Sequence, residues 1–460
     1  MIKEFNLTKI LKTALKRGGG FAEIYFEQSQ PTSIVCEDNK IEKIITGIDT
    51  GVGIRVIHDH KTSYAFTNTV NEMSLMDLAD SVSLACKEGI YEREIDLTEQ
   101  KQGRRFIIKE LPQNVSIQEK VNLVIRANKI ARSRDKRIRQ VKVVYRDGLQ
   151  KILIANSQGS LVEDERISTL FVVQVVASRD GIIQTGYEPG GGFIGFEFFD
   201  DNPPEKFAEI ASSRAILMLE ARKSPGGLMP VVLSSEAGGT MIHEAIGHGL
   251  EADLAQEGLS VYSNRLGQMV ASPLITVMDD STLTNKRGSY CFDDEGIPSQ
   301  KTILVDKGQL RGYLYDRLTS MKDKVNSTGN GRRESYRDRP IPRMSNTLIA
   351  PGTSAPVDIL KSTPRGIFVK KMGGGQVNTV NGDFIFEVSE GYLIENGNIG
   401  EPVRGATLTG NGPDILKKID MVGSDLGFGI GTCGKDGQGV PVSDAQPTLR
   451  IPEIVVGGEV

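Results

Sequence analysis

The sequence predicts an α+β fold made of two unlike parts. These are an N-terminal region of antiparallel sheet and helices, residues 1–225, and a large β-rich C-terminal domain, residues 226–460. In the first part, a series of β-rich runs followed by an amphipathic helix occurs twice. In the second part, short β-rich runs alternate with glycine-rich turns. Of the 51 glycines, 16 lie in residues 1–225 and 35 in residues 226–460, so we expect the two parts to be built differently.

The N-terminal region divides further into two subregions, 1–90 and 115–225, joined by a polar connector over residues 91–115. Helices are predicted within residues 1–20, over 74–88, from a capping box at Ser116 and Glu119 to about Ile130, and from Pro203–Pro204 to about Arg222. Strands are predicted over 21–28, 32–38, 40–47, 51–59, 62–68, 141–147, 150–156, 167–178 and 181–188. This order favours a helix-covered antiparallel sheet.

The C-terminal domain is predicted to be almost entirely strands and turns. Only residues 238–254, and a second segment at 412–419, have a helical pattern. The run GDFIFEVSEGYLIENG, residues 382–397, predicts a hairpin with its turn at Ser389–Gly391. Alternatively, this run is an open sheet edge onto which an extended peptide adds as a strand.

Composition excludes several classes of function. The formal net charge is −4, tryptophan is absent and no basic stripe occurs, so we expect no direct binding of nucleic acid. No apolar run approaches the ~20 residues of a membrane span, and the N-terminus lacks an uninterrupted apolar signal. Four widely spaced cysteines do not form a disulfide framework. We therefore expect a cytoplasmic protein with reduced thiols.

The predicted helix at 238–254 contains His243, Glu244 and His248, and this group is typical of a metal site. The common zinc pattern is His-Glu-x-x-His, whereas here the histidines are one residue farther apart. On a regular α-helix, five residues place the two imidazoles roughly 140° apart, so they could not share an ion. Shared ligation requires either a π-type turn or a helix that ends near Gly247. Gly247 and Gly249 supply the backbone freedom for both.

A catalytic zinc site needs a third protein ligand. The alternatives are Glu251 or Asp253 on the same helix, or Cys433, which glycines flank on both sides. Cys36, Cys86 and Cys291 lie among larger residues and are expected to be inert core thiols. His58 and His60 alternate on a predicted strand, share one face, and are expected to be exposed edge residues.

A second group of residues that could act in function is an arginine-rich run over residues 332–343. It is either a solvated loop or a substrate loop whose guanidinium groups bind carboxylates or peptide carbonyls. The five arginines are Arg332, Arg333, Arg337, Arg339 and Arg343.

Five long blocks follow one another along the second half of the chain: HEAIGHGLEAD (243–253), DDEG (293–296), TGNGRRESYRDRPIPRMSNT (328–347), GGGQVNTVNGDFIFEVSEGYLIENG (373–397) and GIGTCGKDGQGVPV (429–442). In this order, they resemble the TldD/PmbA family of metallopeptidases, and in particular its TldD branch. The blocks span most of residues 228–458, while the N-terminal half carries weaker signatures.

The resemblance implies a zinc site formed by His243, His248 and Cys433, with Glu244 as the general base. It also implies pairing with a sister subunit of the PmbA (TldE) branch that lacks the zinc motif, and cleavage of short or unfolded peptides. We accordingly expect a homodimer or such a heterodimer, with the site in an enclosed cavity. The alternative is a non-catalytic peptide-binding or regulatory subunit, for example one that modulates a topoisomerase, because family members are linked by name to DNA gyrase.

Overall fold

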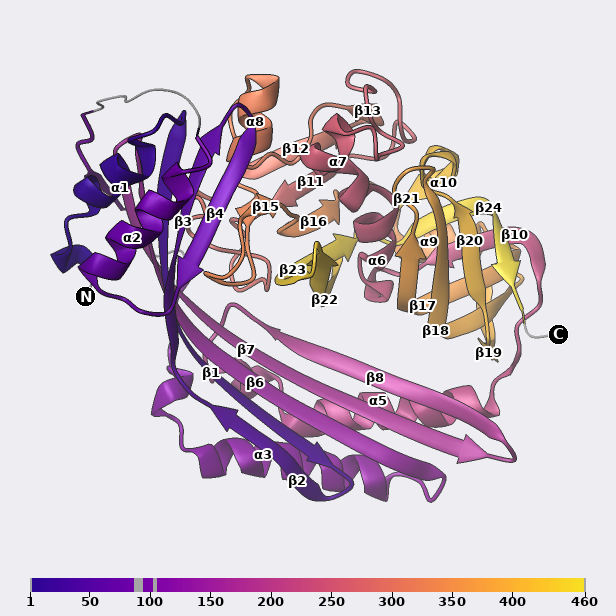
Figure 1. The fold of residues 1–460 in the computed structure, drawn as a ribbon. Helices are drawn as coiled ribbons and strands as arrows, with labels where there is room; N and C mark the ends of the chain where they lie inside the picture. Colours follow the sequence, from indigo (N-terminus) through magenta and orange to yellow (C-terminus); the bar gives the residue numbers. More distant parts are fainter. Residues whose placement is uncertain (1, 87–93, 102–105, 459–460) are drawn as a thin grey trace.

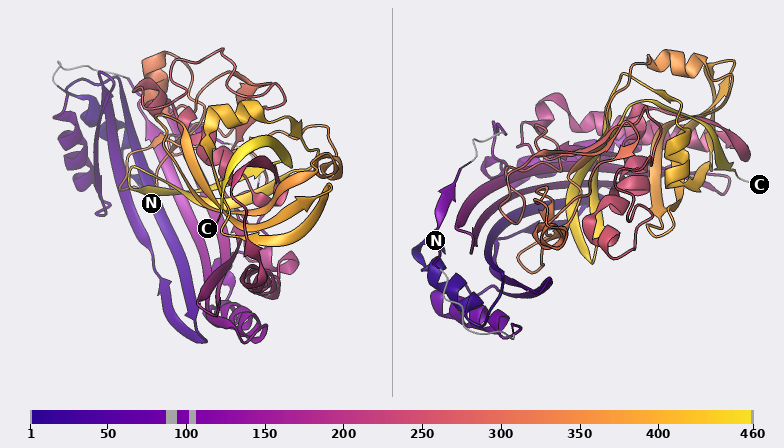
Figure 2. Two further views of the ribbon diagram at one scale, coloured as in Figure 1. Left: turned by 90° about the vertical axis from the view of Figure 1, so that its right-hand side faces the viewer. Right: turned by 90° about the horizontal axis from the view of Figure 1, so that it is seen from above.

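The computed structural model describes residues 2–86, 94–101 and 106–458 and has the predicted mixed α+β architecture (Figure 1). A long antiparallel sheet covered by helices forms the N-terminal part. Two further sheets and several short helices form the C-terminal part, which lies against the sheet (Figures 1 and 2). No helix among these described residues is long and apolar enough to cross a membrane.

The N-terminal sheet has eight strands in the order β4-β3-β1-β6-β7-β5, with β2 paired to β1 and β8 paired to β7. The ladder between β1 and β6 runs from Glu23 opposite Asn156 to Glu37 opposite Lys142. Residues of both predicted subregions therefore share one continuous sheet. Its strands are β1 (Phe21–Glu37), β2 (Lys40–Thr46), β3 (Asp49–His58), β4 (Lys61–Thr67), β5 (Thr98–Gln100), β6 (Ile138–Asn156), β7 (Ser160–Arg179) and β8 (Ile182–Gly192).

β1 and β6 are each one long strand where the sequence predicted two short ones. Pro31 and Gly148, at which those runs were separated, lie opposite each other in the β1–β6 ladder. On its other side, β1 pairs with β3 as far as Ser29 and with β2 from Thr32. Because proline has no N–H to donate, it is tolerated where the strand changes partner.

Helices cover the sheet in two places. α1 (Leu7–Leu15) and α2 (Glu72–Ser83) lie beside β3 and β4, while α3 (Ile117–Ser133) and α5 (Pro204–Glu220) lie along β6, β7 and β8 (Figure 1). The Ser116 hydroxyl accepts the Glu119 N–H at 3.2 Å, as the predicted cap requires. The helix predicted over 74–88 ends at Ser83; residues 87 and 88, like parts of the predicted connector, lie outside the described residues. The remaining short turns are η1 (Ile2–Glu4), η2 (Pro112–Asn114) and α4 (Phe198–Asp201).

The C-terminal part contains an eight-stranded sheet in the order β17-β10-β24-β20-β18-β19-β9, in which β21 also pairs with β24. Because β17 also pairs with β18, five of these strands form a closed ring around a large apolar core. The strands are β9 (Arg222–Lys223), β10 (Gly227–Leu233), β17 (Arg365–Val377), β18 (Asp383–Glu395), β19 (Asn398–Arg404), β20 (Thr407–Asn411), β21 (Met421–Val422) and β24 (Leu449–Gly457).

A six-stranded sheet, in the order β13-β12-β11-β16-β23-β22, lies between this ring and the N-terminal sheet (Figure 1). Its edge strand β22 carries Cys433. The strands are β11 (Val277–Asp280), β12 (Lys301–Asp306), β13 (Gln309–Leu310), β16 (Asn346–Ile349), β22 (Gly427–Lys435) and β23 (Gln438–Gln446), and a separate pair is formed by β14 (Gly331–Arg332) and β15 (Ile341–Pro342).

Two predictions for the C-terminal part were wrong. β18 continues through the predicted turn at Ser389–Gly391, and Gly391 pairs with strands on both sides. The turn instead lies at Asn396 and Gly397, where φ is 51° and 73°; Asn-Gly tolerates these values and Ser-Glu-Gly offers no such pair. The sequence also missed α8 (Arg317–Asp323) and α9 (Pro356–Lys361), whereas α10 (Gly412–Lys418) matches the predicted segment. Both missed helices are too short for a clear period.

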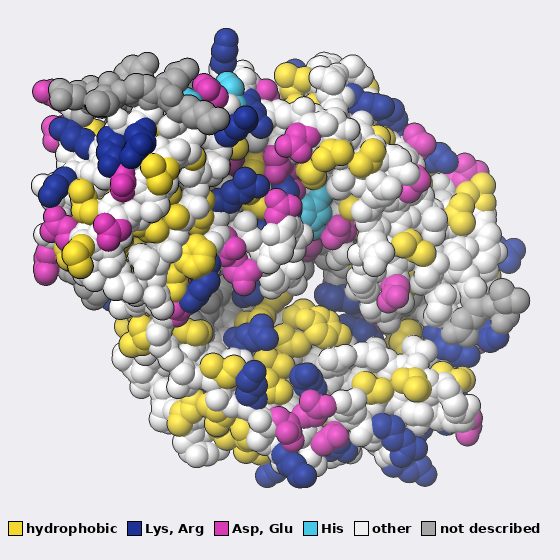
Figure 3. All heavy atoms as spheres, in the orientation of Figure 1, with side chains coloured by type: hydrophobic (Ala, Val, Ile, Leu, Met, Phe, Trp, Pro, Cys, Tyr) yellow, Lys and Arg dark blue, Asp and Glu magenta, His cyan; other side chains and the backbone are white. Residues whose placement is uncertain are grey.

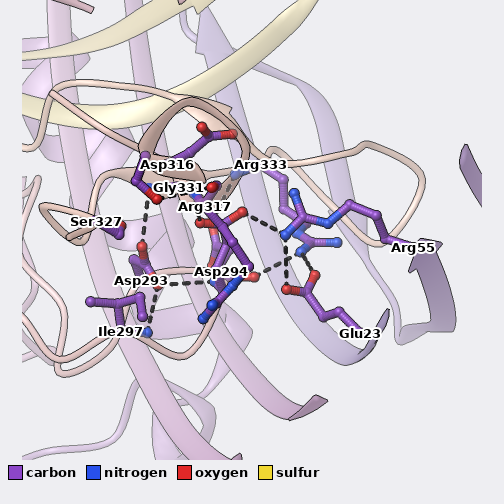
Figure 4. Close-up of polar contacts among 12 residues, drawn as sticks. Glu23, Arg55, Asp293, Asp294, Ile297, Asp316, Arg317, Ser327, Gly331 and Arg333 are labelled. Atoms are coloured by element: carbon purple, nitrogen blue, oxygen red, sulfur yellow. Dashed lines mark hydrogen bonds and ion pairs between the residues drawn. The ribbon is translucent and has the colours of Figure 1, made fainter. Parts of the chain in front are cut away.

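A buried network of ion pairs joins the two parts of the molecule (Figure 4). We call it the junction network. Arg55, on β3, forms ion pairs with Glu23 of β1 and with Glu295 of the C-terminal part. Arg333 forms an ion pair with Glu23 and donates to the Asp294 carbonyl. These charges are almost completely buried, so each depends on its partner in the other part.

Candidate metal centre

The segment from Thr240 to Gln256 is not one regular helix. It consists of α6 (Thr240–Ile242), the π turn η4 (His243–Gly247), the 3-10 turn η5 (His248–Leu250) and α7 (Ala252–Gln256). The His248 N–H donates to the His243 carbonyl, five residues back, which is the hydrogen bond of a π-helix. The predicted departure from α geometry is therefore confirmed. It brings the two imidazole rings together, with their centroids 5.0 Å apart.

Gly247 is needed here for space rather than for an unusual backbone conformation. Its φ of −55° and ψ of −56° are ordinary helical values. A Cβ atom at this position would lie 2.2 Å from Met344 Sδ, and one at Gly249 would lie 2.7 Å from the Tyr262 ring. The sequence argument from backbone freedom at Gly247 is therefore wrong. This glycine allows Met344 to pack closely behind the π turn.

Cys433 lies beside both histidines although it is far away in the sequence. Its Sγ atom is 3.3 Å from His243 Nε2 and 3.4 Å from His248 Nε2. These three side chains offer ligand atoms that all lie within 4.8 Å of one another. Among the described residues, no other group of three or more histidine, cysteine or acidic side chains comes together in this way.

The separations of these atoms fit a zinc ion. Zinc binds sulfur at about 2.3 Å and imidazole nitrogen at about 2.0–2.1 Å, so tetrahedral ligands lie about 3.6 Å apart. The observed distances of 3.3 and 3.4 Å require only a small outward movement of the ligands. Two imidazoles and a thiolate leave the fourth position open, as in catalytic rather than structural zinc sites.

The two histidines also favour the deprotonated, thiolate form of Cys433. Burial alone would raise the pKa of Cys433, but hydrogen bonds and charge interactions with His243 and His248 lower it to about 5. The pKa values of both histidines are raised, although burial opposes this shift. Cys433 raises the pKa of His243, and Glu251 and then Cys433 raise the pKa of His248. At neutral pH the sulfur is therefore a thiolate, which is the form that binds metals.

Glu244 faces the same cavity, which has a volume of about 630 Å³ and is also lined by His243, His248 and Cys433. Figure 3 shows histidine side chains at the surface of the hollow between the two parts of the molecule. Burial raises the pKa of Glu244. No hydrogen bond to the Glu244 carboxylate occurs within the described part of the chain, so this group is available to a substrate or water.

Glu251 and Asp253, the alternative third ligands, lie on the other side of His248. Glu251 Oε2 is 3.1 Å from His248 Nδ1, the ring nitrogen that does not face Cys433. Lys435 Nζ lies 3.1 Å from Glu251 Oε2 and 2.7 Å from Asp253 Oδ1. Although burial opposes it, Lys435 and His248 lower the pKa of Glu251 to about 2. Neither acid belongs to the group of converging ligand atoms.

The arginine-rich run is divided between structural contacts and the surface. Arg332 donates to the Met344 and Pro441 carbonyls, and Arg343 donates to the Cys433 and Gln438 carbonyls. Both are buried, as is Arg333 in the junction network. Arg337 pairs with Asp49 at the surface, and Arg339 is exposed. Substrate contact by any of the five stays a prediction.

The remaining histidines and cysteines lie away from the metal centre. His58 ends β3, whereas His60 lies in the following turn with φ 59° and is exposed, so they do not share a strand face as predicted. Cys36, Cys86 and Cys291 are buried, and none of them forms a disulfide bond within the described residues. Sequence reasoning missed Lys435, although Cys-x-Lys on a strand places both side chains on one face. It also missed Asp444, which lines the cavity and accepts the Gly239 N–H at 3.2 Å.

Comparison with known proteins gives matches along nearly the whole chain. Models of the PmbA/TldA metallopeptidase match as domain 1 over residues 22–87, as the central domain over 110–219 and as the C-terminal domain over 226–458. A metalloprotease TldD homolog of Haemophilus influenzae is 38% identical over 98% of this chain and 96% of its own length. A zinc metalloprotease TldD homolog of Saccharolobus solfataricus is 28% identical over 98% of this chain and its entire length.

Solved structures share the fold. TldE from Thermococcus kodakarensis superposes with a TM-score of 0.78 at 19% identity, over 100% of both chains. A protein from Thermotoga maritima, described as a proposed modulator of a DNA gyrase, has a TM-score of 0.78 at 24% identity, over 95% of this chain and 96% of its own. The three matching domain models and the near full-length relatives show that this chain belongs to the PmbA/TldD family of metallopeptidases, in its TldD branch.

Proposed function

We propose that this protein is a zinc-dependent peptidase that cleaves short or unfolded peptides, with His243, His248 and Cys433 as zinc ligands. The observation that carries the proposal is the convergence of these three ligand atoms beside Glu244 on one cavity wall. The donor set fits zinc and leaves one position open. The naming of a relative as a zinc metalloprotease supports the choice of metal.

Glu244 is the general base of the proposed reaction. A zinc ion held by His243, His248 and Cys433 would act as a Lewis acid and lower the pKa of water to about 7. Glu244 accepts the proton of the attacking water and returns it to the amide nitrogen that leaves. Burial raises the pKa of Glu244, which makes its carboxylate a stronger proton acceptor than an exposed glutamate.

The substrate enters as an extended chain. β22 is the edge strand of the six-stranded sheet and carries Cys433, so a peptide that pairs with its outer edge passes beside the ligands. Gly431 and Thr432 of β22 and Gln376 of β17 line the same cavity. Folded proteins keep their edge strands short or covered, and this restricts cleavage to short or unfolded chains.

We further propose a dimer, either of two copies or with a zinc-less subunit of the PmbA/TldE type. The close likeness in fold to TldE supports a partner of similar shape. The protein is proposed to act in the cytoplasm, where Cys433 and the three other cysteines, none of which forms a disulfide bond within the described residues, stay reduced. A non-catalytic peptide-binding or regulatory subunit is the alternative, but it has no need for Glu244 beside an intact ligand set.

Glu244→Gln separates the two functions. With an unfolded peptide as substrate, we expect the rate to fall by about 10²–10⁴, while zinc content stays near one per chain. Hydrolysis is measured alongside metal analysis, and a stably folded protein of similar composition serves as the control substrate. Unchanged peptide hydrolysis in Glu244→Gln, or equal digestion of the folded protein, contradicts the proposed mechanism.

A further inference from the structure

Two pairs of side chains link the same two segments of the metal centre. His248 and Glu251 belong to the segment after the π turn, and Cys433 and Lys435 belong to β22. Cys433 Sγ is 3.4 Å from His248 Nε2, and Lys435 Nζ is 3.1 Å from Glu251 Oε2. The segment and the strand are therefore held together twice, once by ligand atoms and once by an ion pair.

Glu251 also determines which nitrogen of His248 is available to a metal. Its Oε2 atom is 3.1 Å from His248 Nδ1, and the side chain is fully buried. A carboxylate accepts hydrogen bonds, so His248 Nδ1 carries the proton and donates it. His248 Nε2, which faces Cys433, is then the atom that can ligate a metal. This places Glu251 behind the ligand rather than among the ligands.

Lys435 lines the cavity but has no N–H left for a substrate. An ammonium group has three donors. Those of Lys435 are directed at Glu251 Oε2, Asp253 Oδ1 and the Pro342 carbonyl, at 3.1, 2.7 and 3.1 Å. Lys435 is therefore unsuited to stabilising an oxyanion. Its contacts instead fix the distance between β22 and the His248 segment.

We propose that Glu251 and Lys435 form a clamp that prepares the metal centre before a metal binds. Glu251 orients His248, and Lys435 holds β22 and hence Cys433 against it. Both are positioning residues, since they act through the ligands and not on the substrate. The inference rests on the proposed zinc site and assigns to Glu251 a role other than that of third ligand.

The experiment measures zinc affinity in the full-length chain by competition with a chelator, without any peptide. In Glu251→Gln we expect affinity to fall by about 10- to 100-fold, as for other residues that support a metal ligand. Asp253→Asn is the matched control. It removes the same charge and contacts the same Lys435, but it does not touch His248, so we expect an affinity close to that of the unchanged protein.

Cobalt substitution tests whether Glu251 is itself a ligand. The thiolate-to-cobalt absorption and the overall spectrum should persist in Glu251→Gln at saturating cobalt, whereas Cys433→Ser should lose the thiolate band. Lys435→Met provides a second route if Glu251→Gln does not fold. The loss in the Glu251→Gln, Lys435→Met double variant should be smaller than the two single losses combined, because both break one contact.

The outcomes are distinguishable. Wild-type affinity in a folded Glu251→Gln protein, or an equal loss in Asp253→Asn, overturns the clamp and leaves the zinc site in place. A changed cobalt spectrum in Glu251→Gln makes Glu251 a ligand and also overturns it. If the unchanged protein binds no zinc, the proposed function itself fails.

Discussion

The metal centre and the junction network both bury charged or ionisable side chains, but these side chains face different partners. In the junction network, each buried guanidinium meets a carboxylate. Arg55 pairs with Glu23 (Figure 4) and also with Glu295. At the metal centre, ligand atoms of Cys433 and of two imidazoles lie within 4.8 Å of one another. Where opposite charges meet in the interior, each buried charge depends on its partner. Where a thiolate and two imidazoles converge, the arrangement indicates a binding site.

Removing one proposed zinc ligand should have the largest effect, which is loss of zinc and of peptide hydrolysis. This change should disrupt the metal centre alone. We expect Cys433→Ser, His243→Ala and His248→Ala each to lose zinc, from about one ion per chain, together with peptide hydrolysis. Cys291→Ser is the control, since Cys291 is also a buried cysteine but lies outside the metal centre. Metal analysis and circular dichroism provide the two readouts. Full zinc content in all three ligand variants would contradict the assignment.

Breaking the junction network should lower the free energy of unfolding and leave zinc binding at the metal centre unchanged. Arg55→Met leaves Glu23 and Glu295 buried without this partner, which typically costs about 3–5 kcal/mol. Arg337→Met is the control, because Arg337 is an exposed arginine paired with Asp49, and we expect about 0–1 kcal/mol. Urea unfolding gives both values. A loss of zinc affinity with unchanged stability in Arg55→Met would contradict the assignment of separate roles to the junction network and the metal centre.

Much of the order of helices and strands could be predicted from the sequence. Recognition of the family supplied the three candidate ligands that the structure brings together. Periodicity placed α1, the capping box at Ser116 placed α3, and the proline pair at Pro203 placed the start of α5. The one-residue excess between His243 and His248 predicted an irregular helix, which the π turn confirms. The spacing alone could not choose among Glu251, Asp253 and Cys433 as the third ligand. That choice depends on how β22 packs against the π turn, which local sequence does not encode.

The junction network could not be predicted for a related physical reason. The arginines of residues 332–343 have the composition of an exposed loop, and only tertiary contacts show that Arg333 is paired with Glu23, more than three hundred residues away. The length of β1 was missed because Pro31 is normally a strand breaker. Its position becomes tolerable only once β2 and β3 are known to share one edge of β1.

The smallest expected effect is a change in the pH dependence of stability at the edge of the junction network. Glu27 accepts the Tyr336 N–H at 2.8 Å, and burial raises the pKa of Glu27 from 4.5 to about 7. Between these values the unfolded chain loses this proton before the folded protein does. The contribution of Glu27 to stability is therefore present below pH 4.5, is lost as pH rises to about 7, and is constant above.

Glu27→Gln removes this titration, so we expect the variant to gain stability relative to the unchanged protein between pH 4.5 and 7. Taking the difference between the two proteins cancels other acids that titrate in the same range, such as Asp316, whose pKa burial raises to about 7. Urea unfolding is done with a chelator present, because metal binding is itself pH-dependent. Glu257→Gln, at an exposed position, is the control and should show no such trend. If the difference in the free energy of unfolding between Glu27→Gln and the unchanged protein does not vary with pH, the Glu27 carboxylate is as well stabilised in the folded protein as in water. Burial at the edge of the junction network would then carry no cost for this charge.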